Sequence, residues 1–205
     1  FRRVLFRSFL RKSKWFIENN IKEPNLLDFL DIVSLGTICD VVPLVGLNRA
    51  IVKQGLKILN QKKNLGLKTL IEICKIEKKA STYHLGYVLG PRINAGGRVG
   101  KCSHGANLLL NKDPKESFKI ASELENFNKD RKKIEGELLN SVLNIVDKNL
   151  NDPVLILSGK NWHEGIIGII ASRLKDKFNK PTIIISLNNK IGKASARSVR
   201  SEEHT

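Results

Sequence analysis

A chain of 205 residues that is 41% hydrophobic can bury the core of one large or two small domains, which excludes general disorder. No apolar run approaches the ~20 residues that cross a bilayer and no signal-peptide pattern is present, so we expect a monomeric, cytoplasmic protein with no membrane partner. The net charge of +16, from 36 basic and 20 acidic residues, indicates a polyanionic partner, although a lysine-rich composition spread over the surface would give the same balance.

The two ends of the chain look foreign to the rest. Residues 1–8 and 200–205 resemble translations of sequencing-library adapters, so we expect that neither segment is native and that motifs lie beyond both ends. Together they carry four arginines and two glutamates, so the strongly positive balance does not depend on them.

The first part of the chain, residues 9–112, reads as short helices joined by turns. An apolar segment covers residues 26–33, and Asn48 is positioned to cap a helix with apolar residues at helical spacing over residues 51–59. Another short helix is predicted over residues 67–74. This part is therefore expected to be mostly helical.

One carboxylate stands out within this helical part. Asp40 lies in the largely apolar segment 35–44, and an unpaired carboxylate is costly to bury. We therefore expect Asp40 to be exposed, hydrogen-bonded, paired or bound to a metal ion. A turn or a helix cap ahead of Pro43 is the alternative to a metal ligand.

A glycine-rich segment, residues 89–98, contains Arg92 and Arg98. Glycine lets backbone N–H groups approach an oxyanion closely, and guanidinium groups bind phosphate in a bidentate geometry. The spacing matches neither a P-loop nor a dinucleotide-binding fold. The segment predicts a phosphate-binding loop, with a plain surface turn as the alternative.

Residues 113–152 carry the clearest helix signal in the chain. Asp113 is positioned as the N-cap, Pro114 stands at the first helical position and Glu116 at the third. Apolar residues follow at close to helical spacing until a terminating segment at residues 149–153. More than thirty helical residues span roughly 50 Å, which is typical of an element that connects two lobes, and a coiled coil is the alternative.

After Pro153 the pattern changes to α/β. Buried strands are predicted over residues 154–157 and 182–185, with a helix over residues 165–178 between them. A third strand over residues 190–199 follows a turn. Strand, helix and strand imply a parallel pair, and the turn implies a hairpin. The predicted fold class is therefore α/β, with two lobes joined by a long connector helix.

Two segments of this α/β part could contact an anion. In the loop 159–165, ahead of a helix N-terminus, His163 could donate a hydrogen bond to phosphate, and Trp162 could stack on a base or merely pack. Small residues surround Arg197 in the third strand, and they let a phosphate chain approach. A strand covered by a helix would also be built from small residues, so structural roles are the alternative at both places.

Taken in order, these segments resemble the RecJ family of the DHH phosphoesterase superfamily over almost the whole chain between its two ends. Residues 27–49 resemble the metal-aspartate motif of that family, and residues 90–98 resemble its arginine loop. Residues 162–174 are similar to its Trp-His helix-entry motif, and residues 193–198 to its Arg-Ser motif, both in the DHHA1 domain. Alanines 194 and 196 stand where many members have glycine.

The resemblance implies a division of the chain and a set of site residues. Residues 9–112 would form the C-terminal part of a DHH domain, residues 113–152 the connector helix, and residues 153–199 the start of a DHHA1 domain. Asp40 would be a catalytic ligand of two Mn²⁺ or Mg²⁺ ions. The implied substrate contacts are Arg92, Asn94, Arg98, His163, Ser195, Arg197 and Ser198.

For the intact parent protein, the resemblance implies an exonuclease that hydrolyses single-stranded DNA from its five-prime end. The Asp-His-His motif of the family is absent from this chain, so we expect the chain alone to be inactive. One alternative is a phosphodiesterase of the same superfamily acting on short oligonucleotides or cyclic dinucleotides, although no Gly-Gly-His occurs here. The other is a non-catalytic module that binds single strands. We further expect Asp40 and the arginine loop to line one cleft.

Overall fold

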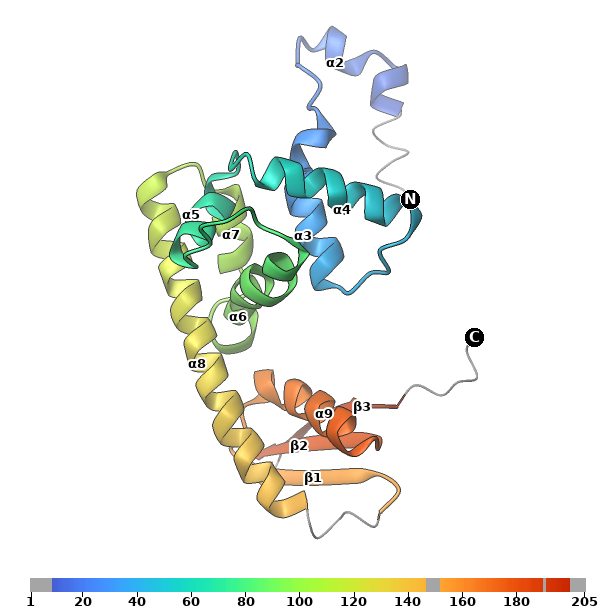
Figure 1. Cartoon of the computed structure of the whole chain (residues 1–205), viewed down its shortest axis with the longest axis vertical. Coiled ribbons are helices and arrows are strands. Elements are labelled where there is room, and N and C mark those ends of the chain that lie inside the picture. Colours follow the sequence, from blue (N-terminus) through green and yellow to red (C-terminus); the bar gives the residue numbers. More distant parts are fainter. Residues whose placement is uncertain (1–8, 147–151, 190, 200–205) are drawn as a thin grey trace. The chain divides into compact units, whose positions relative to one another are not determined.

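The computed structural model describes residues 9–146, 152–189 and 191–199, and the chain divides into two compact units, residues 1–61 and 62–205. The first unit contains, in chain order (Figure 1), α2 (Trp15–Glu18), the 3₁₀ helix η1 (Leu26–Phe29), α3 (Leu30–Cys39) and α4 (Gly46–Leu59).

In the first unit, α3 and α4 pack closely because small residues stand at their contact. The buried Ser34 hydroxyl donates to the Leu30 carbonyl at 2.6 Å and lies 3.2 Å from the Ile51 carbonyl of α4. A Cβ at Gly55 would lie 2.1 Å from the Leu30 carbonyl oxygen, so only glycine permits this approach. The predicted cap at Asn48 is wrong. α4 starts at Gly46, and the Asn48 amide inside it donates to the Pro43 carbonyl at 3.1 Å.

The second unit begins with short helices that surround the first half of a long one. In order these are α5 (Leu65–Ile73), the π-helical stretch η2 (His84–Leu89), α6 (Gly90–Val99), α7 (His104–Leu110) and α8 (Pro114–Val146). Their shared core consists of fully buried apolar side chains: Leu67, Leu70, Leu85, Leu89, Ala95, Leu108, Ala121 and Leu124. The helical character predicted for this region is confirmed.

The loop conformation predicted for residues 89–98 is wrong, because these residues form the end of η2 and helix α6, whereas phosphate binding by this segment stays a prediction. Pro91 stands in the first turn of α6, where its fixed φ suits a helix. Gly96 serves packing, since a Cβ there would lie 2.7 Å from the Lys101 carbonyl oxygen. The glycines that indicated a loop instead let helix α6 approach its neighbours closely.

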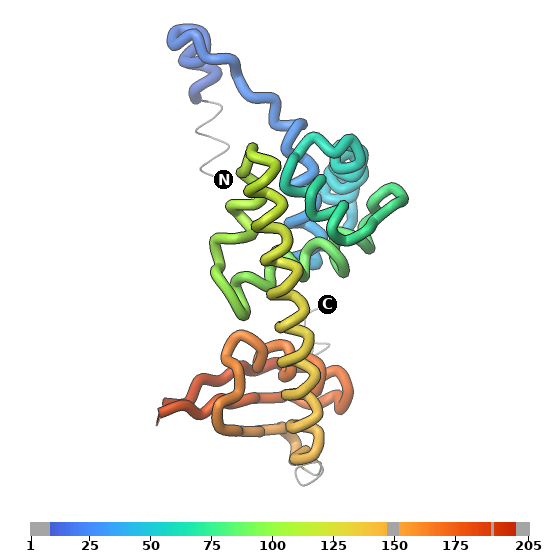
Figure 2. Tube along the Cα trace, turned by 90° about the vertical axis from the view of Figure 1, so that its left-hand side faces the viewer, coloured from blue at the N-terminus to red at the C-terminus, as the bar shows by residue number. Residues whose placement is uncertain are grey.

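The long helix α8 begins where the sequence predicts, at Pro114, and has 33 residues. An Asp113 carboxylate oxygen accepts from the Lys115 backbone N–H at 2.8 Å, as expected of an N-cap. The predicted terminator lies largely outside the described residues. α8 runs from the helices around α5 and α7 to the strands (Figure 2), so the expected connector is confirmed. No helix in the described ranges is long and apolar enough to cross a membrane.

The α/β part consists of β1 (Leu155–Lys160), α9 (Glu164–Phe178), β2 (Thr182–Asn188) and β3 (Ile191–Arg197). β1 pairs with β2 in parallel and β2 with β3 in antiparallel, so the predicted crossover and hairpin are both confirmed. β1 and β2 each run three residues past their predicted ends. One sheet face packs on α9 and α8 through a second core: Leu138, Val142, Val146, Leu157, Ile166, Ile170, Leu174 and Ile184.

Candidate nucleic-acid interface

The C-terminal end of α6 meets the N-terminal end of α9 at Arg98. A Cβ at Gly165 would lie 2.3 Å from the Arg98 carbonyl oxygen, so glycine is required for this contact. The Arg98 guanidinium donates to the Gly165 carbonyl at 3.2 Å and is otherwise exposed. Arg98 is therefore held at the start of α9, with donor groups left for another acceptor.

Arg197 of β3 reaches the second turn of the same helix. Its Nη1 donates to the Ser195 hydroxyl at 3.1 Å and to the Ala196 carbonyl at 2.7 Å. A Cβ at Gly168 would meet the Arg197 Nη2 and the Ser195 hydroxyl, each at 3.1 Å. Arg98 and Arg197 are thus brought to neighbouring turns of α9, from elements about a hundred residues apart in the sequence.

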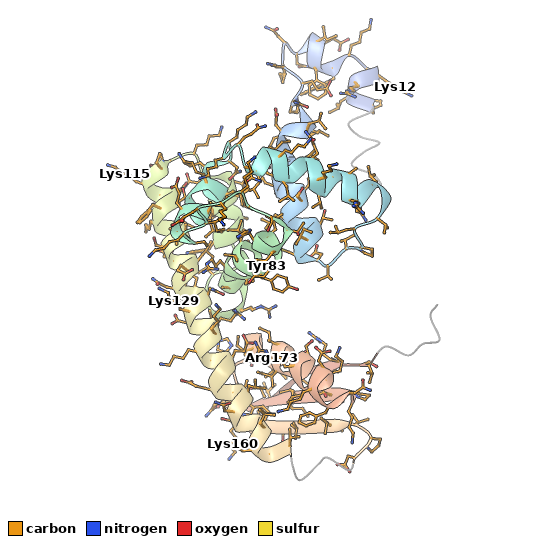
Figure 3. The ribbon with its side chains drawn as sticks, in the orientation of Figure 1. Lys12, Tyr83, Lys115, Lys129, Lys160 and Arg173 are labelled. Carbon is orange, nitrogen blue, oxygen red and sulfur yellow. The ribbon has the colours of Figure 1, made fainter. Side chains whose placement is uncertain are left out.

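A buried carboxylate underlies this region. Glu135 of α8 is almost fully buried and forms ion pairs with Arg131, at 2.6 Å, and with Arg173 of α9. Arg131 also lies 3.2 Å from the buried Asn128 amide oxygen. Figure 3 marks Arg173 on α9. Two guanidinium groups on one buried carboxylate join α8 to α9 and leave an excess of positive charge.

The pKa of Arg98 reflects these surroundings. Burial lowers the pKa of this guanidinium, and the charge of Arg131 lowers it further. Glu135 opposes the shift, and Arg197 adds to the lowering. An arginine nevertheless stays charged at neutral pH. The arginine cluster, defined here as Arg98, Arg131, Arg173 and Arg197 with Glu135, therefore gathers like charges that a polyanion would stabilise.

The loop before α9 is organised largely by its own contacts. His163 is the N-cap of α9, where its Nδ1 accepts from the Gly165 backbone N–H at 3.2 Å. In the neutral ring the proton then sits on Nε2, which is the nitrogen left to donate to a ligand. Trp162 packs over Gly159, where a Cβ would lie 2.1 Å from the indole, and it joins the second core. The packing alternative for Trp162 is the one that this geometry favours.

A surface ion pair ties the start of α9 to β3. The Lys193 ammonium lies 2.6 Å from the Glu164 carboxylate, and this hydrogen bond lowers the pKa of Glu164. Arg197 pairs in the sheet with Thr182, at the opposite end of β2 from the loop of His163. The Arg197 guanidinium lies beside Gly168, in the second turn of α9. The exposed Ser198 donates a hydrogen bond to the Val199 carbonyl at 3.0 Å, and Val199 is not a predicted site residue.

Arg92, in contrast, is engaged within the protein. Its Nε forms an ion pair with Glu125 of α8, and its Nη1 donates to the Val88 carbonyl at 2.8 Å. Only 15% of the side chain is exposed, so this guanidinium anchors α6 to α8. Asn94 lies exposed on α6. Of the two predicted arginines of this segment, Arg98 is the one with accessible donors.

Asp40 lies in the other unit, at the C-terminal end of α3. Its side chain is exposed, and the next residue, Val41, has a φ of 53°. A β-branched residue in this left-handed region is strained, so the turn that ends α3 forms at an energetic cost. The carboxylate suits a hard divalent ion. Within residues 9–146, 152–189 and 191–199, however, no group of three or more metal-ligating side chains is present.

Sequence reasoning missed Arg131 and Glu135. The sequence did contain a signal. Glu135 stands among the apolar positions of α8 that are expected to face the core, and Arg131 precedes it by four residues. A charge on the buried face of a helix requires a partner, and the i,i+4 arginine supplies one. The second partner, Arg173, depends on how α8 and α9 pack, and sequence spacing does not give that.

The chain is similar to known proteins in sequence and in fold. Residues 151–204 match the model of the DHHA1 domain. The chain is 39% identical, over 96% of its length, to the single-stranded-DNA-specific exonuclease RecJ of Salmonella typhimurium, and it spans about a third (36%) of that relative. Crystal structures of RecJ from Thermus thermophilus in complex with Mn²⁺ and with Mg²⁺ align with 89% of the chain, at TM-scores of 0.77 and 0.74 and identities of 30% and 29%. The chain spans 27% and 28% of the length of these two RecJ chains. Over the part of these proteins that it spans, the chain is similar to RecJ proteins in sequence and in fold.

Proposed function

We propose that this chain is part of a metal-dependent exonuclease that hydrolyses single-stranded DNA from the five-prime end. The observation that carries the proposal is the arginine cluster, in which Arg98 and Arg197 keep exposed donors beside the start of α9. Relatives named as single-stranded-DNA-specific exonucleases support the choice of substrate. Because that substrate lies in the bacterial cytoplasm, the chain would act there, as a monomer.

The chain's own residues would hold the strand. Arg98 and Arg197 would each donate charge-assisted hydrogen bonds to phosphate oxygens, with Ser195 fixing the Arg197 guanidinium. His163 would donate from Nε2, because its Nδ1 is occupied. Arg92 and Asn94 stay predictions as substrate contacts, with Arg92 better suited to holding α6 in place. Ser198 also stays a prediction.

Asp40 would provide one carboxylate to the metal site. When Mn²⁺ or Mg²⁺ is bound in such a site, it lowers the pKa of a bound water and stabilises charge on the phosphoryl group. Asp40 would orient its carboxylate toward the ion from the strained turn that ends α3. The described residues contain no group of three or more side chains that could bind a metal ion. Other parts of the intact enzyme would supply the remaining ligands.

This proposal predicts binding without cleavage. The purified chain should bind a fluorescently labelled single-stranded oligonucleotide in an anisotropy titration, because the arginine cluster is present. It should not digest the oligonucleotide in Mn²⁺, because two-metal hydrolysis needs several ligands and this chain has one predicted ligand. Robust digestion would show that the catalytic centre is elsewhere, and absence of binding would contradict the proposal.

A further inference from the structure

Two tyrosines form an exposed aromatic pair in the second unit. Tyr83 and Tyr87 stack on each other, with ring centroids 5.2 Å apart and an interplanar angle of 29°. Their side chains belong to residues that are 61% and 74% exposed, so at least one ring face of the pair stays open to solvent. Figure 3 labels Tyr83 beside α6. Aromatic rings of this size are normally packed, and a solvent-facing pair calls for an explanation.

The pair belongs to the same continuous helical run as two predicted substrate contacts. Tyr83 directly precedes η2, Tyr87 lies within it, and Asn94 and Arg98 lie on α6, and all four are exposed. The stacking of Tyr83 on Tyr87 places their rings on one side of the run, and the four-residue spacing within α6 brings Asn94 and Arg98 to one side of that helix. Leu85, Leu89 and Ala95 of the same run are buried. Tyr87 and Arg98 are separated by roughly 16 Å along the axis at about 1.5 Å per residue.

The tyrosines stand on a rigid and basic support. His84, between them and the core, accepts from the Ser81 backbone N–H at 3.0 Å and makes an edge contact with Tyr83. A depression beside Tyr83 is lined by Lys75 and Lys78 with Glu77 as the acidic residue. The π-helical winding of η2 is itself uncommon and is frequent at functional sites. The surroundings therefore favour a ligand that combines flat rings with negative charge.

We propose that Tyr83 and Tyr87 are a stacking platform for the bases of single-stranded DNA, continuous with the phosphate contact at Arg98. This inference rests on the proposed function and adds a subsite to it. Bases stack on aromatic rings irrespective of sequence, so the platform would bind strands without sequence preference. Arg98 would hold a phosphate of the same strand a few nucleotides away.

The test separates base contacts from phosphate contacts. Anisotropy titrations would use a labelled oligonucleotide and an abasic strand of equal length. Tyr87→Ala should weaken binding of the oligonucleotide by about fivefold or more, since a base stack contributes ~1–3 kcal/mol, and it should leave binding of the abasic strand unchanged. Tyr87→Phe should retain wild-type affinity for both strands, because the ring is kept. Tyr83→Ala should behave like Tyr87→Ala.

Two controls complete the design. Phe118→Ala removes an aromatic ring of similar exposure at the start of α8 and should change neither titration. Arg98→Ala should weaken the binding of both strands, because it removes a phosphate contact. An equal loss on both strands for Tyr87→Ala, or no loss on either, would overturn the platform. Failure of the wild-type chain to bind either strand would instead overturn the proposed function beneath it.

Discussion

At the scale of single residues, charge and burial conflict at a few positions, and those positions organise the molecule. Glu135 is an acidic group on the buried face of α8 and is compensated by arginines from two helices. Asp31, on α3 of the first unit, is buried to 3% exposure and accepts from the adjacent Ile32 N–H at 2.7 Å. Glu135 forms two ion pairs, whereas no ion pair of Asp31 is present among the described residues, so substitutions at the two should have opposite effects.

Glu135→Gln should lower the free energy of unfolding by on the order of 2–3 kcal/mol. Removing one charge of a buried pair leaves the others uncompensated, which usually costs about 3–5 kcal/mol, and the expected value is smaller because Arg173 is half exposed. Urea unfolding followed by circular dichroism measures the change. Glu116→Gln, which breaks an exposed contact with Lys119, is the matched control and should change stability by under ~0.5 kcal/mol. Equal effects of the two variants would contradict the central role of Glu135.

Asp31 gives a prediction for pH. Burial raises the pKa of Asp31, opposed by hydrogen bonds from backbone N–H groups, and the charge of Asp28 adds a smaller rise. The folded state therefore holds this proton more tightly than the unfolded state, and stability falls as pH rises from the unfolded value of 3.8 through the raised one. Asp31→Asn removes that loss and keeps the acceptor oxygen. The variant should be more stable than wild type at pH 7, and the gap should shrink below the unfolded pKa. Urea unfolding of the wild type and the variant, at pH 7 and at a pH below 3.8, measures the difference in free energy of unfolding. A difference that does not depend on pH would refute the argument.

At the scale of elements, the sequence predicted what local rules govern. Asp113 and Pro114 mark the start of α8, and the buried strands and their crossover follow from apolar runs and a turn. The glycine-rich segment was misinterpreted as a loop because glycine also serves close helix packing, as at Gly96. Asn48 failed as a cap because the helix starts two residues earlier. Only part of the Gly96 packing, against Leu124 of α8 at 3.4 Å, comes from an element distant in sequence.

Two glycine substitutions test this distinction between packing and helix propensity. Gly165→Ala should destabilise the chain by about 1–3 kcal/mol, because the new Cβ would overlap the Arg98 carbonyl oxygen and push α9 away from α6. Gly136→Ala, with nothing within 4 Å on the exposed side of α8, should stabilise it by about 0.5–1 kcal/mol through helix propensity. Thermal unfolding of both variants gives the comparison. A stabilising Gly165→Ala would show that the helices are not in contact at this point.

At the scale of the whole chain, the family was recognisable from the order of its motifs, whereas the composition of the site was not. The sequence pointed to Arg98 and Arg197, and the fold brings them to neighbouring turns of α9. The sequence also predicted Arg92 as a substrate contact, although in the structure this side chain forms an ion pair with Glu125. The difference arises because a guanidinium's partner is decided by helix packing. The net charge of +16 gives the chain a general attraction to polyanions that these specific contacts must exceed.

The most direct test of the account is the salt dependence of oligonucleotide binding by the wild-type chain and by the double variant Arg98→Ala, Arg197→Ala. Each phosphate contact on a single strand contributes about 0.7 to the slope of log affinity against log salt concentration. The double variant should therefore bind more weakly and show a slope smaller in magnitude by roughly 1.4. A variant in which two exposed surface lysines of α8, Lys119 and Lys129, are replaced by alanine controls for net charge. Equal slopes for the wild type and the arginine variant would contradict the claim that these two arginines bind the phosphates.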